Sequence, residues 1–361
     1  MGVTLRSART LDRGLFAAAA GLALFSGMAM ASAAATVNPA LAARHAIWIA
    51  AGILLSLGAA RIPAHRWMDV AGIAWAVGLL ALALVPIAGA IRLGATRWLS
   101  IFGMSVQPSE IMKLATIGLL ARTLAGQPAP LSTRTLGMSL AVVGPPALLI
   151  FLQPDLGSAS VFGAIWLGMV WVGGISRRML IGLAGAGLAC LPVGWQLLQD
   201  YQRDRLMVFV DPHADPLGAG YTIIQSTIAV GSGQLWGRGW FAGTQNQLSF
   251  LPERHSDFIF SVIGEEWGFL GSVGLVGLFG LLLVRAIHVA RETHDPQGRL
   301  FTVGVFAWLG YQVFVNIGMT MGLLPVVGVP LPLVSYGGSS MVTVWVALGL
   351  VQSIRRSERL A

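Results

Sequence analysis

About ten apolar stretches, most of them 16 to 28 residues long, dominate the sequence and are separated by short segments that carry the charges. A helix needs about 20 apolar residues to cross a bilayer. In lipid only helices or closed barrels pair all backbone groups, and these runs do not alternate as barrel strands do. We therefore predict an all-α polytopic membrane protein, a single domain over residues 1–361, with about ten transmembrane helices near 15–34, 45–60, 67–88, 107–124, 135–152, 156–174, 178–198, 257–284, 300–321 and 338–354.

Charge supports a membrane location. Only 11% of the residues are charged, against about a quarter in soluble domains. The net charge of +8 comes from dispersed arginines, so nucleic-acid binding is not expected. Arginines concentrate in loops on the side of the two termini, which places both termini in the cytoplasm of a multi-pass protein of the bacterial inner (cytoplasmic) membrane. A single cysteine, Cys190, excludes a disulfide within the chain.

The N-terminal run resembles a signal peptide, since Arg6, Arg9 and Arg13 precede it and Ala31-Ser32-Ala33 resembles a cleavage site. Its length suffices to span a bilayer, and nine further spans follow. We therefore expect it to be retained as the first helix.

One long extracytoplasmic loop, residues 199–256, is rich in Gly, Pro, Asp and Arg. A structureless connection of this length is unusual unless it is functional. Within it, Tyr221–Val230 is apolar and is predicted to form a short helix along the membrane surface.

Lys113 is the only lysine in the sequence and lies in an otherwise apolar helical run, three residues after Glu110. The pair shares a helix face. Charges inside a membrane usually line a cavity or pair with each other. The pair is interpreted either as a cavity wall with Lys113 facing an anionic ligand, or as a structural ion pair.

Three acidic residues lie near span ends. Asp257 is the candidate base, because a carboxylate at the boundary beside apolar residues can have a raised pKa. Asp155 is a candidate ligand contact, and either aspartate alternatively caps a helix. Glu265 is close to two turns beyond Asp257 and is expected to share its face, or to be a buried hydrogen-bonded carboxyl.

Several cations accompany these acids. Arg97, Arg203 and Arg205 suit a diphosphate at the outer leaflet. Arg254 and His255 lie close to Asp257 in the sequence and are expected to tune its acidity, and His255 is also a candidate substrate-binding residue. The segment 316–340 is rich in Gly and Pro and should expose backbone beside a cavity. P-loop, HExxH and GxSxG motifs are absent from the sequence. The residues alone leave an enzyme on a lipid-linked anionic substrate and a transporter equally open.

Five segments resemble the SEDS family (shape, elongation, division and sporulation proteins), in the family's order and from about Arg92 onward. They are RWLS…QPSEIMKLA, LQPDLGSA, RLMVFVDPHADPLGAGYTIIQSTIAVGSG, LPERHSDFIFSVIGEEWGFLG and NIGMTMGLLPVVGVPLPLVSYGGSS. The resemblance implies ten transmembrane helices and a peptidoglycan glycosyltransferase that polymerises lipid II into β-1,4 glycan strands at the outer leaflet. By this resemblance, the family's essential loop aspartate corresponds to Asp257. The family's pair of one acidic and one basic residue in the fourth helix corresponds to Glu110 and Lys113. Some members have a basic residue at Ser105.

The run LWGRGWFAGTQNQLSFLPERHSDF is similar to members that serve cell-wall elongation and rod shape. The implied partners are undecaprenyl-diphosphate-linked glycan, a class B penicillin-binding protein (a transpeptidase) and elongation-complex membrane proteins. No metal ligands are assigned, although a divalent cation, Mg²⁺ or Mn²⁺, is compatible with diphosphate chemistry. The alternatives are a lipid II flippase, a division polymerase, and a non-catalytic scaffold for a penicillin-binding protein.

Overall fold

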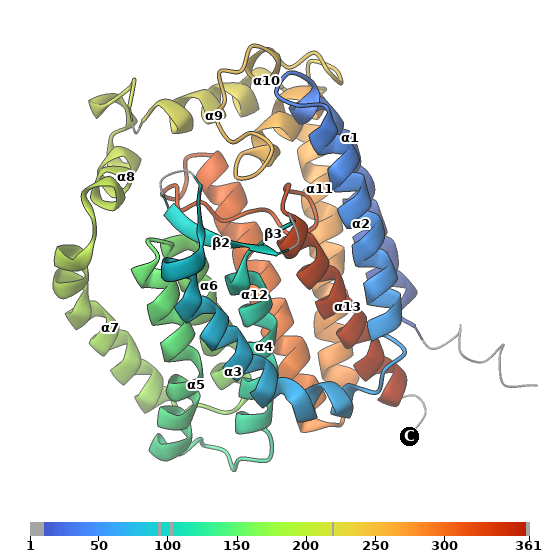
Figure 1. The fold of residues 1–361 in the computed structure, drawn as a ribbon, viewed down its shortest axis with the longest axis vertical. Coiled ribbons are helices and arrows are strands. Elements are labelled where there is room, and N and C mark those ends of the chain that lie inside the picture. Colours follow the sequence, from blue (N-terminus) through green and yellow to red (C-terminus); the bar gives the residue numbers. More distant parts are fainter. Residues whose placement is uncertain (1–10, 93–94, 102–103, 219, 359–361) are drawn as a thin grey trace, which may run out of the picture.

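The computed structural model describes residues 11–92, 95–101, 104–218 and 220–358 and is a tall helical bundle (Figure 1). All ten predicted runs are helices. Their bounds are α1 (Arg13–Ala35), α2 (Ala40–Ala59), α3 (Ala64–Ala88), α4 (Pro108–Leu124), α5 (Thr133–Leu152), α6 (Leu156–Val172), α7 (Arg177–Leu197), α11 (Ile259–Glu292), α12 (Pro296–Thr320) and α13 (Gly338–Glu358). The eighth predicted run ends at residue 284, whereas α11 continues to Glu292.

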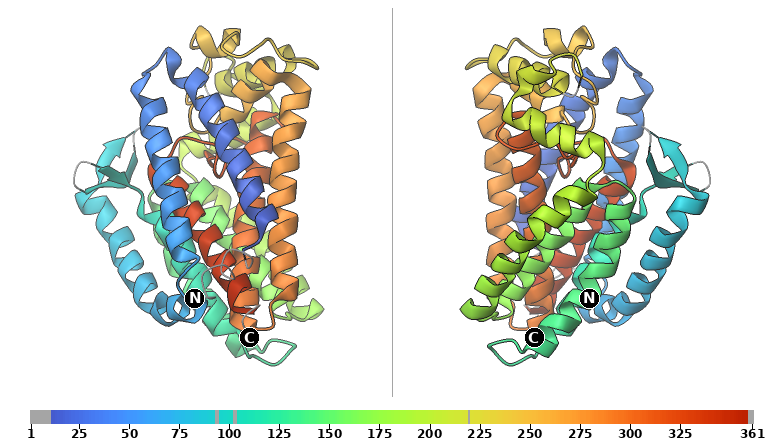
Figure 2. Two further views of the ribbon diagram at one scale, coloured as in Figure 1. Left: turned by 90° about the vertical axis from the view of Figure 1, so that its right-hand side faces the viewer. Right: turned by 90° about the vertical axis from the view of Figure 1, so that its left-hand side faces the viewer.

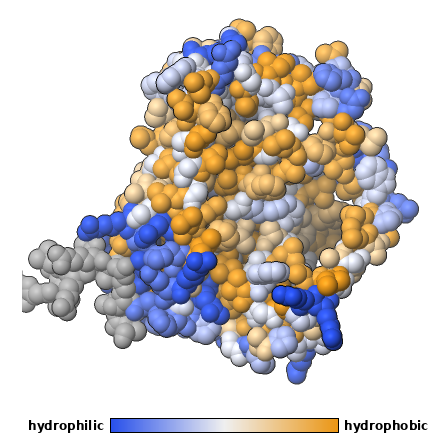
Figure 3. All heavy atoms as spheres, turned by 180° about the vertical axis from the view of Figure 1, so that it is seen from behind, coloured by the Kyte–Doolittle hydropathy of each residue, from blue (hydrophilic) through white to orange (hydrophobic). Residues whose placement is uncertain are grey.

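Seven of the helices in the described ranges are long and apolar enough to cross a membrane, namely α1, α2, α3, α5, α7, α11 and α12. The other three differ because α4 and α6 have 17 residues each and α13 carries Gln352, Arg355 and Arg356. On the face shown in Figure 3, apolar residues dominate the middle and hydrophilic residues gather toward the two ends. The protein is thus a multi-pass membrane protein, and the number of ten crossings stays a prediction.

The core lies where α4, α6, α12 and α13 pack together. Trp308, Trp345, Phe162 and Met112 are fully buried there. Helix α7 contrasts with these, since none of its residues is buried, and it lies at the edge of the bundle (Figure 1).

Helix α1 packs against α11 and is fixed to it at both ends. At one end, here called the terminal end, the Asp12 carboxylate accepts a hydrogen bond from Arg285 Nη2 at 2.6 Å and lies 3.0 Å from Arg355 Nη1. At the opposite end, here called the loop end, Ser32 Oγ donates to Glu266. The run that resembles a signal peptide is therefore an integral part of the bundle, and its retention stays a prediction.

The connection between α3 and α4 forms a small antiparallel sheet in the order β1-β2-β3, which sequence reasoning did not predict. Its strands are β1 (Ala90–Arg92), β2 (Ala95–Ile101) and β3 (Met104–Val106). Leu99 pairs with Val106 and Ser100 with Ser105. The sheet projects beside α3 in both side views (Figure 2).

The long loop folds over the loop end as α8 (Asp200–Val210), the 3₁₀ turn η2 (Pro212–Ala214), α9 (Tyr221–Ser232) and α10 (Thr244–Gln247) (Figure 2). The predicted helix at Tyr221–Val230 is confirmed as α9. It buries Ile223, Ser226 and Ala229 and packs against α11 and α12. Whether it lies on a membrane surface stays a prediction.

Helix α11 is interrupted at Gly268, which has a φ of 65°. This left-handed conformation favours glycine. The break frees backbone groups, which the preceding loop satisfies: Phe269 N donates to Gln234 O at 2.8 Å, and Arg238 N donates to Glu265 O at 2.9 Å. Residues 234–238 of the loop are thereby fixed to α11, and the loop residues that line the candidate site follow them in the chain.

Candidate functional site

A cavity of about 810 Å³, here called the central cavity, opens between the small sheet, the start of α4 and the loop that precedes α11. Its wall includes Arg44, Trp48, Arg97, Ser105, Gln107, Glu110, Asp155, Glu253, His255, Asp257, Tyr336, Ser339 and Ser340. Helices α4, α6 and α13 begin at or beside this wall. Helix N-termini carry partial positive charge, so together with Arg44 and Arg97 they make the cavity suitable for an anion.

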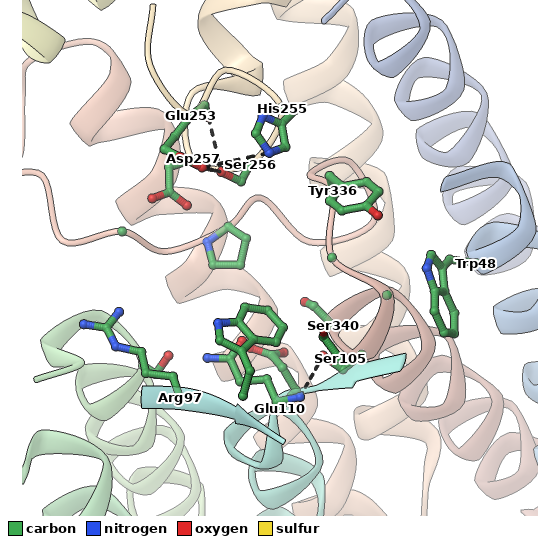
Figure 4. Close-up of a pocket in the computed structure, with 18 of the residues that line it drawn as sticks. Trp48, Arg97, Ser105, Glu110, Glu253, His255, Ser256, Asp257, Tyr336 and Ser340 are labelled. Carbon is green, nitrogen blue, oxygen red and sulfur yellow. Dashed lines mark hydrogen bonds and ion pairs between the residues drawn. The ribbon is translucent and has the colours of Figure 1, made fainter. Parts of the chain in front are cut away.

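Asp257 lies in this wall, and its carboxylate points into the cavity (Figure 4). The N-cap residue of α11 is Phe258, without a side-chain cap, so the alternative that Asp257 caps this helix is wrong. Burial, reinforced by the negative charge of Glu253, raises the pKa of the Asp257 carboxyl to about 6, and the positive charges of Arg205 and Arg97 oppose the rise. A carboxylate with a pKa near neutrality is suited to general base catalysis.

Glu253 is a second carboxylate at the site that sequence reasoning missed. Its Oε2 accepts a hydrogen bond from Ser256 Oγ at 3.1 Å and lies 3.9 Å from His255 Nε2. Its backbone has a φ of 47°, a conformation that non-glycine residues adopt rarely and that often marks a functional site. Its position could have indicated this role, because Glu253 lies four residues before Asp257 in the same motif.

His255 also lines the central cavity. Burial and the nearby charge of Arg254 lower the pKa of its imidazole, and Glu253 opposes this. The ring meets Tyr336 edge-on, with 5.9 Å between centroids. A neutral imidazole in this place can donate one hydrogen bond and accept another.

Arg97 and Asp155 lie on the side of the cavity opposite Asp257. Arg97 extends from β2 into the space that the Asp257 carboxylate faces (Figure 4). Its Nη1 lies 3.8 Å from Asp155 Oδ2, and its Nε donates to Gln153 O at 3.2 Å. Asp155 Oδ1 accepts from Ser158 N at 3.0 Å and caps α6. Asp155 therefore performs the capping role that the sequence left open and also contributes to the cavity wall.

Glu110 and Lys113 form a buried ion pair of 2.8 Å beneath the cavity. Glu110 reaches the cavity wall, whereas Lys113 is fully buried, does not line the cavity, and lies 5.0 Å from the ring centroid of Trp308. The structural ion pair is thus confirmed, and a direct contact of Lys113 with a ligand in this cavity is not. Lys113 therefore contacts Glu110 and not the cavity itself.

Two further predicted site residues, Arg203 and Glu265, lie elsewhere, and so does Arg254, which was expected to tune Asp257. Arg203 donates to the carbonyls of Trp195 and Gln196 at the end of α7. Glu265 is fully buried and accepts from Gln245 N at 2.9 Å, so its alternative as a hydrogen-bonded carboxyl is confirmed. Arg254, expected beside Asp257, instead donates to Ala33 O at 3.1 Å.

Arg205 does belong to the site. It lines a second cavity of about 530 Å³, the side cavity, between α8 and residues 325–328. Both Asp257 and Glu253 line this cavity, the central cavity and a third space of about 280 Å³. Two large spaces therefore meet at the Asp257 carboxylate.

No group of three His, Cys, Asp or Glu side chains in the described parts of the chain is arranged to hold a metal ion. A divalent cation would need ligand oxygens from a bound phosphate in addition to carboxylates such as Glu253 or Asp155. The metal therefore stays a prediction.

The family described as cell cycle protein, which comprises FtsW, RodA and SpoVE, matches residues 10–360. The peptidoglycan glycosyltransferase MrdB of Escherichia coli K12 is 46% identical over 256 residues, which are 70% of this chain and 69% of that protein. The stage V sporulation protein E of Bacillus subtilis 168 is 38% identical over 257 residues, 71% of this chain and 70% of that protein.

Two solved structures share the fold. A chain of a peptidoglycan synthase complex, described for its coordination of polymerization and crosslinking, superimposes with a TM-score of 0.84 at 36% identity and covers 97% of this chain and 99% of its own. The rod shape determining protein RodA of Thermus thermophilus superimposes with a TM-score of 0.73 at 31% identity and covers 96% of this chain and 97% of its own.

Proposed function

This chain belongs to the family of cell cycle proteins that comprises FtsW, RodA and SpoVE, and we propose that it is a peptidoglycan glycosyltransferase of the RodA type. Its substrate is lipid II, which it polymerises into β-1,4 glycan strands for cell-wall elongation. The enzyme class agrees with the names of its relatives, MrdB among them. The observation that carries the mechanism is the Asp257 carboxylate, placed where two large cavities meet and opposite Arg97.

The reaction joins two lipid-linked sugars. Two cavities that both reach Asp257 suit it, because each cavity can hold one of the two sugars. The growing strand is the donor, and its anomeric carbon is bonded to undecaprenyl diphosphate. The acceptor 4-hydroxyl attacks this carbon as Asp257 takes its proton. The diphosphate leaves with the bonding electron pair, and inversion of the α-linked donor produces a β-1,4 bond.

The departing diphosphate gains negative charge, which nearby cations stabilise. Arg97 lines the central cavity and Arg205 lines the side cavity, and both are close enough to affect the charge of Asp257. We assign the stabilisation of the diphosphate to these two arginines. Glu110 shapes the floor of the cavity, and Lys113 compensates its charge.

The protein acts in the inner membrane with both termini in the cytoplasm, which places the cavity toward the outer leaflet. Its partner is a class B penicillin-binding protein that cross-links the strands, together with other elongation-complex membrane proteins. The fold shared with a chain of a peptidoglycan synthase complex supports this partner.

The test is polymerisation of lipid II by the purified complex with its cognate transpeptidase, whose own active site is blocked. Wild type should yield glycan polymer on a gel, and Asp257→Asn should lose activity by on the order of 10²-fold or more. Asp200→Asn, which alters an exposed carboxylate on α8, is the matched control and should keep full activity.

Polymer from Asp257→Asn at the wild-type rate would remove the base assignment. If an assembled wild-type complex makes no polymer, the proposed activity is wrong. A transbilayer movement assay with lipid II would then decide between a flippase and a non-catalytic scaffold.

A further inference from the structure

Three successive backbone carbonyls that end at Asp257 are held by the C-terminal third of the chain. The oxygens of residues 255–257 accept one hydrogen bond each. In order, the donors are Tyr336 N at 2.8 Å, Ser335 Oγ at 2.5 Å and Asn316 Nδ2 at 2.9 Å. We call the two side chains, Asn316 and Ser335, the carbonyl clamp.

Asn316 connects two walls of the central cavity. It is fully buried in α12, and its Nδ2 also donates to Val329 O at 2.7 Å. Val329 follows Gly328, and a Cβ placed on Gly328 would lie 3.3 Å from Asp257 Oδ2. One amide group therefore fixes the backbone of Asp257 and the segment that packs against its carboxylate. Because an amide nitrogen has two hydrogens, both of its donors are used.

Ser335 also donates its single hydroxyl hydrogen to the backbone next to Asp257. Its Oγ accepts from Leu331 N at 2.8 Å, so the hydroxyl hydrogen remains for Ser256 O. The residue is buried in the turn that precedes α13.

Within the described structure, the Asp257 carboxylate accepts no hydrogen bond from a protein group. The orientation of this carboxylate therefore depends on the backbone of Asp257. The carbonyl clamp fixes that backbone through hydrogen bonds to the carbonyl oxygens of residues 256 and 257. A displacement of about 1 Å at a reacting group can cost on the order of 10²-fold in rate.

We propose that Asn316 and Ser335 are positioning residues for glycosyl transfer, which hold the backbone of residues 255–257 so that the Asp257 carboxylate faces both cavities. This inference rests on the proposed function. Neither residue touches the reacting atoms. Their action is on the geometry of the base, and a merely structural role would affect folding and not the base.

The experiment compares variants of the full chain in its complex with the transpeptidase, using radiolabelled lipid II. Asn316→Ala and Ser335→Ala remove the donors, and Ser335→Thr restores one. Two controls remove equally buried groups at the terminal end: Gln352→Leu removes an amide bonded to Asp12, and Ser353→Ala removes a hydroxyl bonded to Ile62 O.

We expect kcat to fall on the order of 10- to 100-fold in both clamp alanine variants, with KM for lipid II changed less than about twofold. Ser335→Thr should recover most of the rate, and both controls should keep it. The negative charge of Glu253 raises the pKa of Asp257, so a displacement that separates the two carboxylates lowers this pKa. The pH at half-maximal rate should therefore move to lower pH in the alanine variants only.

Unchanged kcat in folded clamp variants would overturn the inference, as would a fall in rate with no movement of the pH profile. If Asn316→Ala does not fold, the comparison of Ser335→Ala with Ser335→Thr decides the question alone. Absence of polymer from the wild-type complex is a separate result, because it would remove the proposed function and the inference with it.

Discussion

The ammonium nitrogen of Lys113 lies 2.8 Å from Glu110 Oε1 directly beneath the central cavity, and almost no solvent reaches either side chain. The second oxygen, Glu110 Oε2, has no hydrogen-bond partner in the described structure. Two opposite charges are thus held together in an apolar layer, where each depends on the other for compensation.

Removal of one member of this pair should therefore destabilise the protein more than removal of both. Lys113→Met leaves a buried, uncompensated carboxylate and should cost roughly 3–5 kcal/mol. Lys113→Met combined with Glu110→Gln should recover much of this loss. Thermal unfolding of the detergent-solubilised variants measures the effect, and a double variant less stable than Lys113→Met would contradict it.

The rate of polymerisation should follow the ionisation of Asp257. Because only the ionised carboxylate accepts a proton, and burial together with the charge of Glu253 raises its pKa to about 6, the rate should rise with pH through this value. Glu253→Gln removes a negative neighbour, which lowers the pKa of Asp257 and moves the profile to lower pH.

The pH profile of kcat on lipid II measures this shift. Asp200→Asn is again the control, since its exposed carboxylate lies on α8. A shift to higher pH in Glu253→Gln would show that Glu253 does not act through its charge.

Gly328 and Gly322 offer a matched pair in one connecting segment, with φ values of 70° and 71°. Alanine at either position should cost about 1–2 kcal/mol, because side chains disfavour this conformation. Only at Gly328 does the added Cβ meet Asp257 Oδ2, at 3.3 Å; at Gly322 it meets Thr227. Gly328→Ala should therefore reduce kcat while Gly322→Ala reduces stability alone. Equal rates in the two variants, at equal stability, would refute the contact.

Asp12 should contribute stability that is lost in acid. Burial raises the pKa of its carboxyl, but hydrogen bonds from Arg285 and Leu15 and the charge of Arg355 outweigh burial, so the net pKa is lowered from 3.8. A lowered pKa means that the contribution is complete above about pH 3.8 and disappears as pH falls through the folded-state value.

Asp12→Ala should consequently cost roughly 1–3 kcal/mol at neutral pH, because the hydrogen bonds of Asp12 with Arg285 and Leu15 are lost while Arg355 keeps Glu292 at 3.0 Å. Thermal unfolding at several pH values measures it. The difference from wild type should shrink in acid, and a constant difference would argue against the ion pair as its cause.

The helices were predictable because hydropathy alone specifies which segments leave water. The pattern predicted all ten long helices and α9. It did not predict the sheet β1-β2-β3, because three-residue strands such as β1 and β3 carry too little periodicity to be recognised. The extension of α11 to Glu292 was missed because its last turns are amphipathic and no longer uniformly apolar.

The site was predicted in part. Asp257, Asp155, Arg97, Arg205, His255 and Glu110 all line the cavities. Glu265 was misplaced because a helix was assumed to begin at Asp257, whereas residues 253–258 form a turn and α11 begins at Ile259. Arg203 was misplaced because sequence does not show which side of α8 faces the cavity. The clamp joins residues 59 and 79 positions apart, a relationship that no local pattern contains.

Because α1 is fixed to α11 near both ends, by Arg285 with Asp12 and by Glu266 with Ser32, these two helices form a stiff wall. Helix α7 has no buried residue and no comparable attachment among the bonds described. We therefore expect the bundle to be mechanically asymmetric, with its compliance concentrated at α7. We therefore expect the cavities to widen on that side when a bulky chain enters or leaves, while Asp257 keeps its position through the bonds of its segment to Asn316 and Ser335.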